Sequence, residues 1–105
     1  MRVISRRPLR EFWEIHSQAK APLSAWYRVM EQTRFADFNA IKAAFPAADY
    51  VAPLTIFDIG GNKFRLITAI HHNTGRVFVR NVLTHPEYDR WTDDKRRRKQ
   101  PKRGK

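Results

Sequence analysis

Hydrophobic residues in the first half of the chain recur at the spacing of an α-helix. In the first stretch they fall at i, i+3, i+4 and i+7, on one face of a helix that ends near Ser17. The members of this stripe are Leu9, Phe12, Trp13 and His16. A second stripe at helical spacing consists of Leu23, Trp26, Tyr27 and Met30. Helical spacing favours a place in the core for these aromatic residues over a surface that stacks bases.

Residues that start and stop helices mark the ends of the predicted segments. Ser5 is the expected N-cap of the first helix, Pro8 falls in its first turn, and Pro22 can start the second helix. A third, shorter helix is expected to begin at an Asp37 cap and to stop at Pro46.

After Ala48 the pattern changes to the alternation of β-strands. Gly60-Gly61-Asn62 and Asn73-Thr74-Gly75 tolerate positive φ and are expected to be the turns between strands. The predicted strands cover residues 54–59, 63–71 and 76–83, and a short strand covers residues 1–4. The order β-α-α-(α)-β-β-β predicts an α+β domain in which the helices pack on one face of an antiparallel sheet.

Basic residues are concentrated near the C-terminal end. The net charge is +11 at pH 7, and residues 95–105 (KRRRKQPKRGK) contain eight of the 21 basic residues and no acidic one. The remaining 13 basic residues face 10 acidic ones in residues 1–94. Because like charges repel, we predict one folded domain over residues 1–94 and a disordered polybasic tail over residues 95–105. Charge alone favours nucleic acid over an anionic membrane surface as the partner of such a tail.

Composition also argues against several kinds of site. The chain has no cysteine, which excludes disulfides, a thiol nucleophile and a Cys-ligated zinc. The adjacent His71 and His72 would point to opposite faces of a strand, so we expect no metal and no cofactor. No apolar run is long enough to span a membrane and no leader resembles a signal peptide, so we expect no membrane partner. A reduced cytoplasm is compatible with this composition.

Four blocks of sequence resemble HigB-type toxins, the first of them in two pieces. The N-terminal part contributes MRVIS (residues 1–5) and LREFW (residues 9–13), and the middle contributes KAAFPAAD (residues 42–49). The most specific blocks are FDIGGNKFRLI (residues 57–67) and VRNVLTHPEYD (residues 79–89). These blocks occur in the order expected for the family, and the resemblance extends over roughly residues 1–91. The basic tail lies outside the resemblance.

The resemblance implies a RelE-like fold and a toxic endoribonuclease activity. Toxins of this superfamily cut mRNA, often during translation on the ribosome, with a basic surface of the sheet. A HigA-type helix-turn-helix antitoxin neutralises them, so contact with DNA is expected only through that antitoxin. The compartment implied is the cytoplasm.

Cutting RNA without a metal needs cations and proton-transfer groups, because the 2′-hydroxyl of the substrate is itself the nucleophile. Lys63 and Arg65 are two apart in one predicted strand and are expected on one face. Arg80 lies in the neighbouring strand, so that the two arginines can share a phosphate. The resemblance favours them as the phosphate clamp. The alternative is a structural ion pair between Arg80 and Asp58.

His85 and Tyr88 follow the last strand, where a catalytic group has access to substrate. Histidine serves as acid or base near neutral pH, and Tyr88 can stack a base or donate its hydroxyl proton. Lys63 is a second candidate base, because nearby arginines favour its neutral form. The alternative is that His85 caps the turn before Pro86 and that Tyr88 packs against the sheet. Having both Lys63 and His85 departs from the common RelE pattern and leaves the division of acid and base open.

The candidate residues form two overlapping sets. The catalytic candidates are Lys63, Arg65, Arg80, His85 and Tyr88. The RNA-binding candidates are Lys63, Arg65, Arg76, Arg80, Lys95, Arg96, Arg97, Arg98 and Lys99. Two other functions compete with the endonuclease: a non-catalytic RNA- or ribosome-binding module, and a degraded toxin that binds its antitoxin but cuts nothing. The histidine at a strand end favours the nuclease, since a protein that only binds has no need of it.

Overall fold

The computed structural model describes residues 1–61 and 63–99, with side chains described up to Asp94. The helices are α1 (Arg7–Ile15), α2 (Lys20–Gln32), α3 (Phe38–Ala44) and α4 (His85–Lys99), with a 3-10 helix, η1 (Ser17–Ala19), before α2. The strands are β1 (Arg2–Ile4), β2 (Asp49–Val51), β3 (Leu54–Ile59), β4 (Phe64–His71) and β5 (Arg76–Thr84). The predicted α+β class is confirmed.

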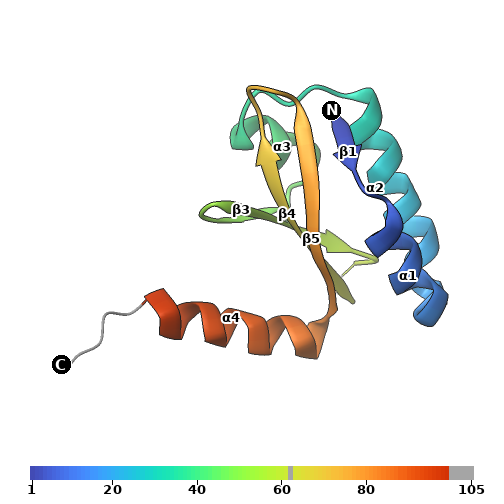
Figure 1. The fold of residues 1–105 in the computed structure, drawn as a ribbon, viewed down its shortest axis with the longest axis vertical. Helices are drawn as coiled ribbons and strands as arrows, with labels where there is room; N and C mark the ends of the chain where they lie inside the picture. Colours follow the sequence, from blue (N-terminus) through green and yellow to red (C-terminus); the bar gives the residue numbers. More distant parts are fainter. Residues whose placement is uncertain (62, 100–105) are drawn as a thin grey trace.

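The strands form one mixed sheet in the order β1-β5-β4-β3-β2 (Figure 1). The strands β2 to β5 make an antiparallel meander, whereas β1 pairs with β5 in parallel. A parallel neighbour requires a crossover, and the helical segment after β1 is part of the long connection that leads to β5. The short edge strand β2 was not predicted, because three residues are too few to show an alternation.

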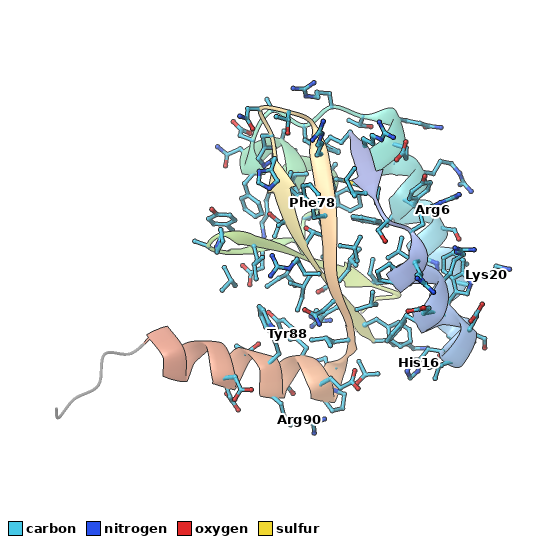
Figure 2. The ribbon with its side chains drawn as sticks, viewed as in Figure 1. Arg6, His16, Lys20, Phe78, Tyr88 and Arg90 are labelled. Carbon is cyan, nitrogen blue, oxygen red and sulfur yellow. The ribbon has the colours of Figure 1, made fainter. Side chains whose placement is uncertain are left out.

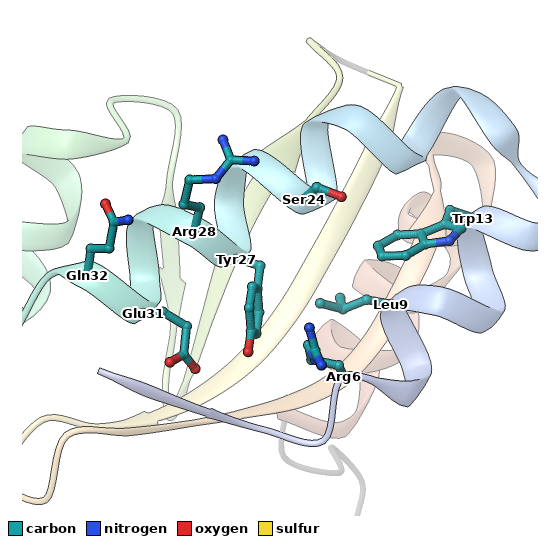
Figure 3. Close-up of a pocket in the computed structure, with 8 residues that line it drawn as sticks. All are labelled: Arg6, Leu9, Trp13, Ser24, Tyr27, Arg28, Glu31 and Gln32. Atoms are coloured by element: carbon teal, nitrogen blue, oxygen red, sulfur yellow. The ribbon is translucent and has the colours of Figure 1, made fainter.

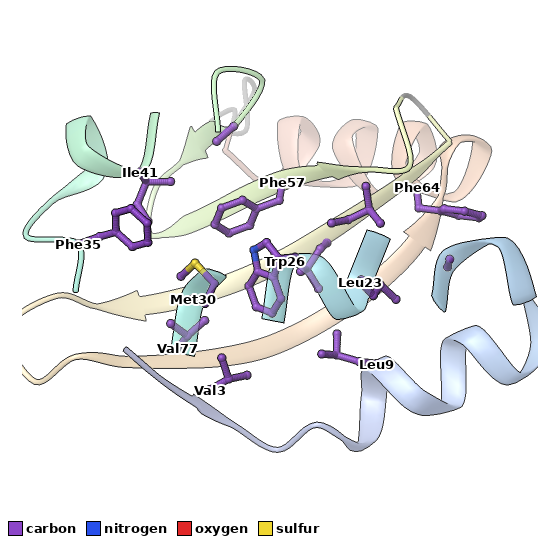
Figure 4. Packing of buried hydrophobic residues seen from close by; sticks show 14 residues of the cluster. Val3, Leu9, Leu23, Trp26, Met30, Phe35, Ile41, Phe57, Phe64 and Val77 are labelled. Atoms are coloured by element: carbon purple, nitrogen blue, oxygen red, sulfur yellow. The ribbon is translucent and has the colours of Figure 1, made fainter. Parts of the chain in front are cut away.

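The main core lies between one face of the sheet and the helices α1, α2 and α3. Figure 4 shows the predicted helical stripes meeting inward-facing strand residues. Trp26 is 2% exposed and packs edge-on against Phe57, with their ring centroids 5.4 Å apart. Trp13 and Tyr27 are partly buried against the same cluster. The expectation that this aromatic stripe belongs to the core is therefore confirmed.

The helix caps follow the sequence in one case and depart from it in another. The Asp37 side chain accepts a hydrogen bond of 3.0 Å from the backbone N–H of Ala40, as a capping residue should. Ser5 is not the N-cap of α1. It has a φ of 69° in the turn from β1 into the helix, and the N-cap is Arg6, which makes no side-chain capping bond. The left-handed turn moved the start of the helix one residue along the chain.

The helix α4 was not predicted, and it packs on the face of the sheet opposite to the other helices. Thr84 and Glu87 cap its first turn reciprocally: the Thr84 N–H donates to Glu87 Oε1 at 2.9 Å, and the Glu87 N–H to Thr84 Oγ1 at 3.4 Å. Tyr88 and Trp91 join a second apolar cluster around Leu54, Ile56 and Ile67. The helices therefore cover both faces of the sheet, and the expectation of a single covered face is wrong.

The predicted boundary after Asp94 falls inside a helix, because α4 continues to Lys99. Residues 100–105, the remainder of the expected disordered tail, lie outside the described residues, as does the turn residue Asn62. The division into a domain and a tail remains a prediction. Within the described part of the chain, no helix has the length and apolar composition that crossing a membrane requires.

Candidate active site

Arg65 is the most firmly held cation of the candidate site. The strand register places it between Asp58 of β3 and Leu83 of β5. Its Nε atom lies 3.1 Å from Asp58 Oδ1, and the two side chains are 12% and 28% exposed. Its Nη1 atom donates to the carbonyl of Phe64 at 3.3 Å. The sheet therefore fixes the orientation of this guanidinium.

Tyr88 of α4 covers the guanidinium of Arg65. The Cζ atom of Arg65 lies 5.2 Å from the centre of the Tyr88 ring, at the distance of a cation–π contact. Tyr88 also stacks on Trp91, with centroids 5.7 Å apart and an interplanar angle of 21°. Figure 2 shows Tyr88 on the side of α4 that faces the sheet. Trp91, which the sequence analysis did not single out, thus helps to hold Tyr88 over Arg65.

His85 opens α4 directly after β5, as the sequence predicted for a residue at the strand end. Its backbone N–H donates to the carbonyl of Lys63 at 3.1 Å. Its ring Nδ1 lies 3.4 Å from Asp89 Oδ2 one turn later, and the His85 side chain is 43% exposed. The imidazole therefore reaches solvent while Asp89 limits its orientation.

Lys63 does not occupy the position that strand alternation predicted. It lies in the turn before β4, which begins at Phe64. Its Nζ atom donates to Gln18 Oε1 of η1 at 3.2 Å, whereas Arg65 contacts Asp58 and Tyr88. The prediction that Lys63 and Arg65 extend from one strand face is wrong, because the alternation of a strand does not hold in the turn before it.

Arg80 lies at a β-bulge. Thr68 of β4 pairs with Val79, and Ile67 pairs with Asn81, so that Arg80 is the extra residue of β5. It is exposed, so its charge stays in contact with water. The alternative ion pair between Arg80 and Asp58 is not observed, since Asp58 pairs with Arg65. The residue opposite Arg65 is Leu83, three positions from Arg80, so the strands are neighbours as predicted but the two arginines are not opposite each other.

The other RNA-binding candidates lie farther away. Arg76 is exposed at the start of β5, opposite His71. The predicted cations from Lys95 to Lys99 belong to the last turns of α4, and their side chains lie outside the description. The structure thus brings Arg65 and Tyr88 into contact and places His85 one turn before Tyr88. Arg76 and Arg80 lie farther along β5.

His71, the last residue of β4, and His72, in the turn that follows, have separate surroundings. The ring of His71 packs edge-on against Phe78 at 5.2 Å, and His72 Nδ1 lies 2.8 Å from the carbonyl of Phe35. Among residues 1–61 and 63–99, no three His, Asp or Glu side chains are grouped as metal ligands would be.

A pocket of about 290 Å³ lies between α1 and α2 (Figure 3). Arg6 lies over the ring of Tyr27 in its wall, 5.0 Å from the ring centre. Trp13 and Leu9 contribute apolar surface. None of the catalytic candidates lines it.

Comparison with known proteins matches most of the chain. A family model described as HigB_toxin, the RelE-like toxic component of a toxin-antitoxin system, matches residues 19–91. The chain is 33% identical over 95 residues to the mRNA interferase HigB of Escherichia coli O6:H1, covering 88% of this chain and 92% of that protein. It is 30% identical over 95 residues to the mRNA interferase toxin HigB of Escherichia coli K12, covering 88% and 91%. A HigB mRNA interferase of Shigella flexneri gives the same values.

Proposed function

The chain belongs to the HigB family, the RelE-like toxins of toxin-antitoxin systems, and from this premise we propose that it cuts mRNA by a metal-independent reaction. The observation that carries the proposal is the group formed by Arg65, Tyr88 and His85. A cation fixed by the sheet, a phenol and an exposed imidazole occur together at the start of one helix. Transfer of a phosphoryl group to the 2′-hydroxyl of RNA needs groups of these kinds.

In the proposed reaction the 2′-oxygen attacks the adjacent phosphorus and the 5′-oxygen leaves. One group accepts the proton of the 2′-hydroxyl and another donates a proton to the 5′-oxygen, which leaves a 2′,3′-cyclic phosphate on the upstream fragment. His85 serves as one of these groups, and Tyr88 or Lys63 as the other. Proton transfer contributes about 10²–10⁴ in rate.

Arg65 stabilises the negative charge that builds up on the phosphate. A guanidinium carries five N–H donors in a planar fork, and its ion pair with Asp58 sets the plane of that fork. A donor fixed in advance loses little orientational freedom when the transition state forms. Arg80 and Arg76, exposed farther along β5, bind more distant phosphates of the RNA.

The partners in this proposal are mRNA in the cytoplasm, engaged on the ribosome, and an antitoxin. The antitoxin is a HigA-type helix-turn-helix protein, and it alone makes the contact with DNA. The cations of residues 95–99 continue the basic surface along α4.

The deciding experiment adds the purified chain to RNA with EDTA and, in parallel, with Mg²⁺. We expect equal cleavage in both and upstream fragments that end in a 2′,3′-cyclic phosphate or a 3′-phosphate. Mass spectrometry of the fragments identifies the ends. Activity that disappears in EDTA and returns with Mg²⁺ would overturn the mechanism. Binding of RNA without any cleavage would support the non-catalytic RNA-binding module instead.

A further inference from the structure

A second, smaller pocket opens where α1 meets η1. Its volume is about 220 Å³, and it is lined by Ile15, His16, Ser17, Gln18 and Phe64. Phe64 pairs across the sheet with Thr84, the residue directly before α4. The pocket therefore lies at the end of the sheet where the proposed catalytic residues begin. Figure 2 shows His16 at this end of the molecule.

Two of the five lining residues of the pocket, His16 and Phe64, are aromatic. The His16 ring stacks on Phe12, with centroids 4.4 Å apart and an interplanar angle of 28°, and lies 5.8 Å from the Phe64 ring. Ile15 is 79% exposed, an apolar side chain that the core does not use. Phe64 is 7% exposed, so the ring that a ligand can reach is that of the half-buried His16. An imidazole beside an exposed apolar side chain can stack on a flat heteroaromatic ring, and unstacked RNA bases are bound in this way.

The rim of the pocket supplies hydrogen-bonding groups and no carboxylate. Gln18 Oε1 accepts from Lys63 Nζ at 3.2 Å. Since lysine can only donate, this contact assigns the amide oxygen to the side of Lys63 and turns the amide NH₂ away from it. Gln18 can therefore donate to the acceptor edge of a base, while the ammonium group of Lys63 lies directly beside it.

Lys63 links the pocket to α4, because its carbonyl accepts the backbone N–H of His85 at 3.1 Å. We infer that the pocket binds one unstacked RNA base next to the phosphate that is cut, and that Gln18 and His16 set the nucleotide preference at that position. The inference rests on the proposed endonuclease function. It also gives Lys63 a different role, that of a phosphate contact beside the bound base.

The test compares two variants with a matched control. Gln18→Ala removes the amide from the pocket, and Ile15→Asp places a negative charge at the pocket entrance. The control is Gln32→Ala, the same glutamine-to-alanine replacement at an exposed position of α2. After the cut in a mixed RNA is mapped, kcat/KM is measured on oligonucleotides that carry each of the four nucleotides on either side of it. We expect the ratio of best to worst nucleotide on one side to fall about two- to tenfold in Gln18→Ala, the value of one net hydrogen bond. Ile15→Asp should also lower it, whereas Gln32→Ala should not.

A binding measurement separates failure of this inference from failure of the proposed function. An oligonucleotide with a 2′-deoxy residue at the cut site cannot be cleaved, and its binding should shift the NMR signals of the His16 ring. Shifts in a chain that cleaves no RNA would support the pocket and overturn the nuclease. Cleavage with no shift at His16 and unchanged ratios in both variants would overturn the pocket alone. If the variants weaken antitoxin binding and leave the ratios unchanged, the pocket serves the antitoxin and the inference is wrong.

Discussion

Arg65 and Arg80 have opposite surroundings, and their replacement therefore tests two kinds of contribution. Arg65 is paired with Asp58 and covered by Tyr88, whereas Arg80 is exposed on a bulge. We expect Arg65→Ala to lower cleavage by about 10²-fold per folded molecule, because it removes a donor to the transition state. Arg80→Ala should lower cleavage through weaker RNA binding, because it removes a contact to a more distant phosphate. Arg10→Ala, at an exposed position of α1, is the control and should keep full activity.

Thermal unfolding distinguishes the two arginines further. Arg80→Ala should leave the melting temperature unchanged, while Arg65→Ala should lower it, because Asp58 loses its partner. If Arg65→Ala lowers stability but retains its activity per folded molecule, the residue serves the Asp58 ion pair and not the phosphate.

His85 tests the proton-transfer step. Its replacement by Ala should lower kcat by roughly 10²–10⁴, with little change in RNA affinity, because a group that moves a proton acts only in the transition state. His71→Ala, an exposed position on β4, provides the matched control. Single-turnover rates and anisotropy with a non-cleavable RNA give the two quantities. Wild-type rates in His85→Ala would transfer the role to Lys63 or Tyr88.

For single residues, the sequence predicted the position along the chain better than the direction in which the side chain points. His85 was expected at a strand end and is found there. The direction of Lys63 was missed because β4 begins one residue later than expected, and alternation has no meaning in the turn before it. The bulge at Arg80 was missed for a related reason: one extra residue interrupts the alternation, and no residue type in RVFVRNVL marks it.

Among the helices and strands, α4 carries two of the proposed catalytic residues, His85 and Tyr88. Its first turn is stabilised by the capping box of Thr84 and Glu87. Losing such a cap costs about 0.5–2 kcal/mol. We expect Thr84→Ala to reduce the helical signal in circular dichroism and to lower cleavage, because the first turn carries His85 and Tyr88. Thr84→Ser keeps the hydroxyl and should behave as the parent. A Thr84→Ala chain with unchanged helicity and activity would show that tertiary packing alone holds the helix.

The sequence contains the signal of a capping box, but the hydrophobic pattern after it does not indicate a helix. A threonine three residues before a glutamate, with a proline between them, is typical of a helix start, and T-H-P-E occurs at residues 84–87. The segment after it is polar, and only Tyr88 and Trp91 join the apolar cluster. Two apolar contacts are too few to produce a helical stripe. The helices α1 and α2, with a full stripe each, were predicted within a few residues of their ends.

For the whole molecule, the charge at the C-terminal end is expected to act on affinity and not on chemistry. For single strands, each neutralised phosphate adds about 0.7 to the slope of log affinity against log salt. If half of the eight basic charges beyond Asp94 engage RNA, deletion after Asp94 should flatten the slope by about 3 and weaken binding. Turnover at saturating RNA should survive, because the proposed catalytic residues all lie between Lys63 and Tyr88.

Since α4 runs past Asp94, the deletion also shortens a helix, and a second variant separates the two effects. Replacing the five basic residues at 95–99 with alanine removes charge while preserving helical propensity. Both variants should give flatter slopes when RNA binding is measured across several salt concentrations. Slopes equal to those of the full chain would leave the basic end without a part in RNA capture and would direct attention to the antitoxin.

The parallel pairing of β1 with β5 also affects biosynthesis. Arg2 lies opposite Arg76 in the parallel pair. The strand β1 is synthesised first, so it cannot pair until β5 has been synthesised. Synthesis proceeds from the N-terminus at about 5–20 residues per second, and α4, with His85 and Tyr88, follows later still. A chain that ends before β5 and α4 can therefore neither complete its sheet nor assemble the proposed catalytic group. The proposed nuclease activity can therefore appear only after synthesis has passed the start of α4, and not in shorter nascent chains.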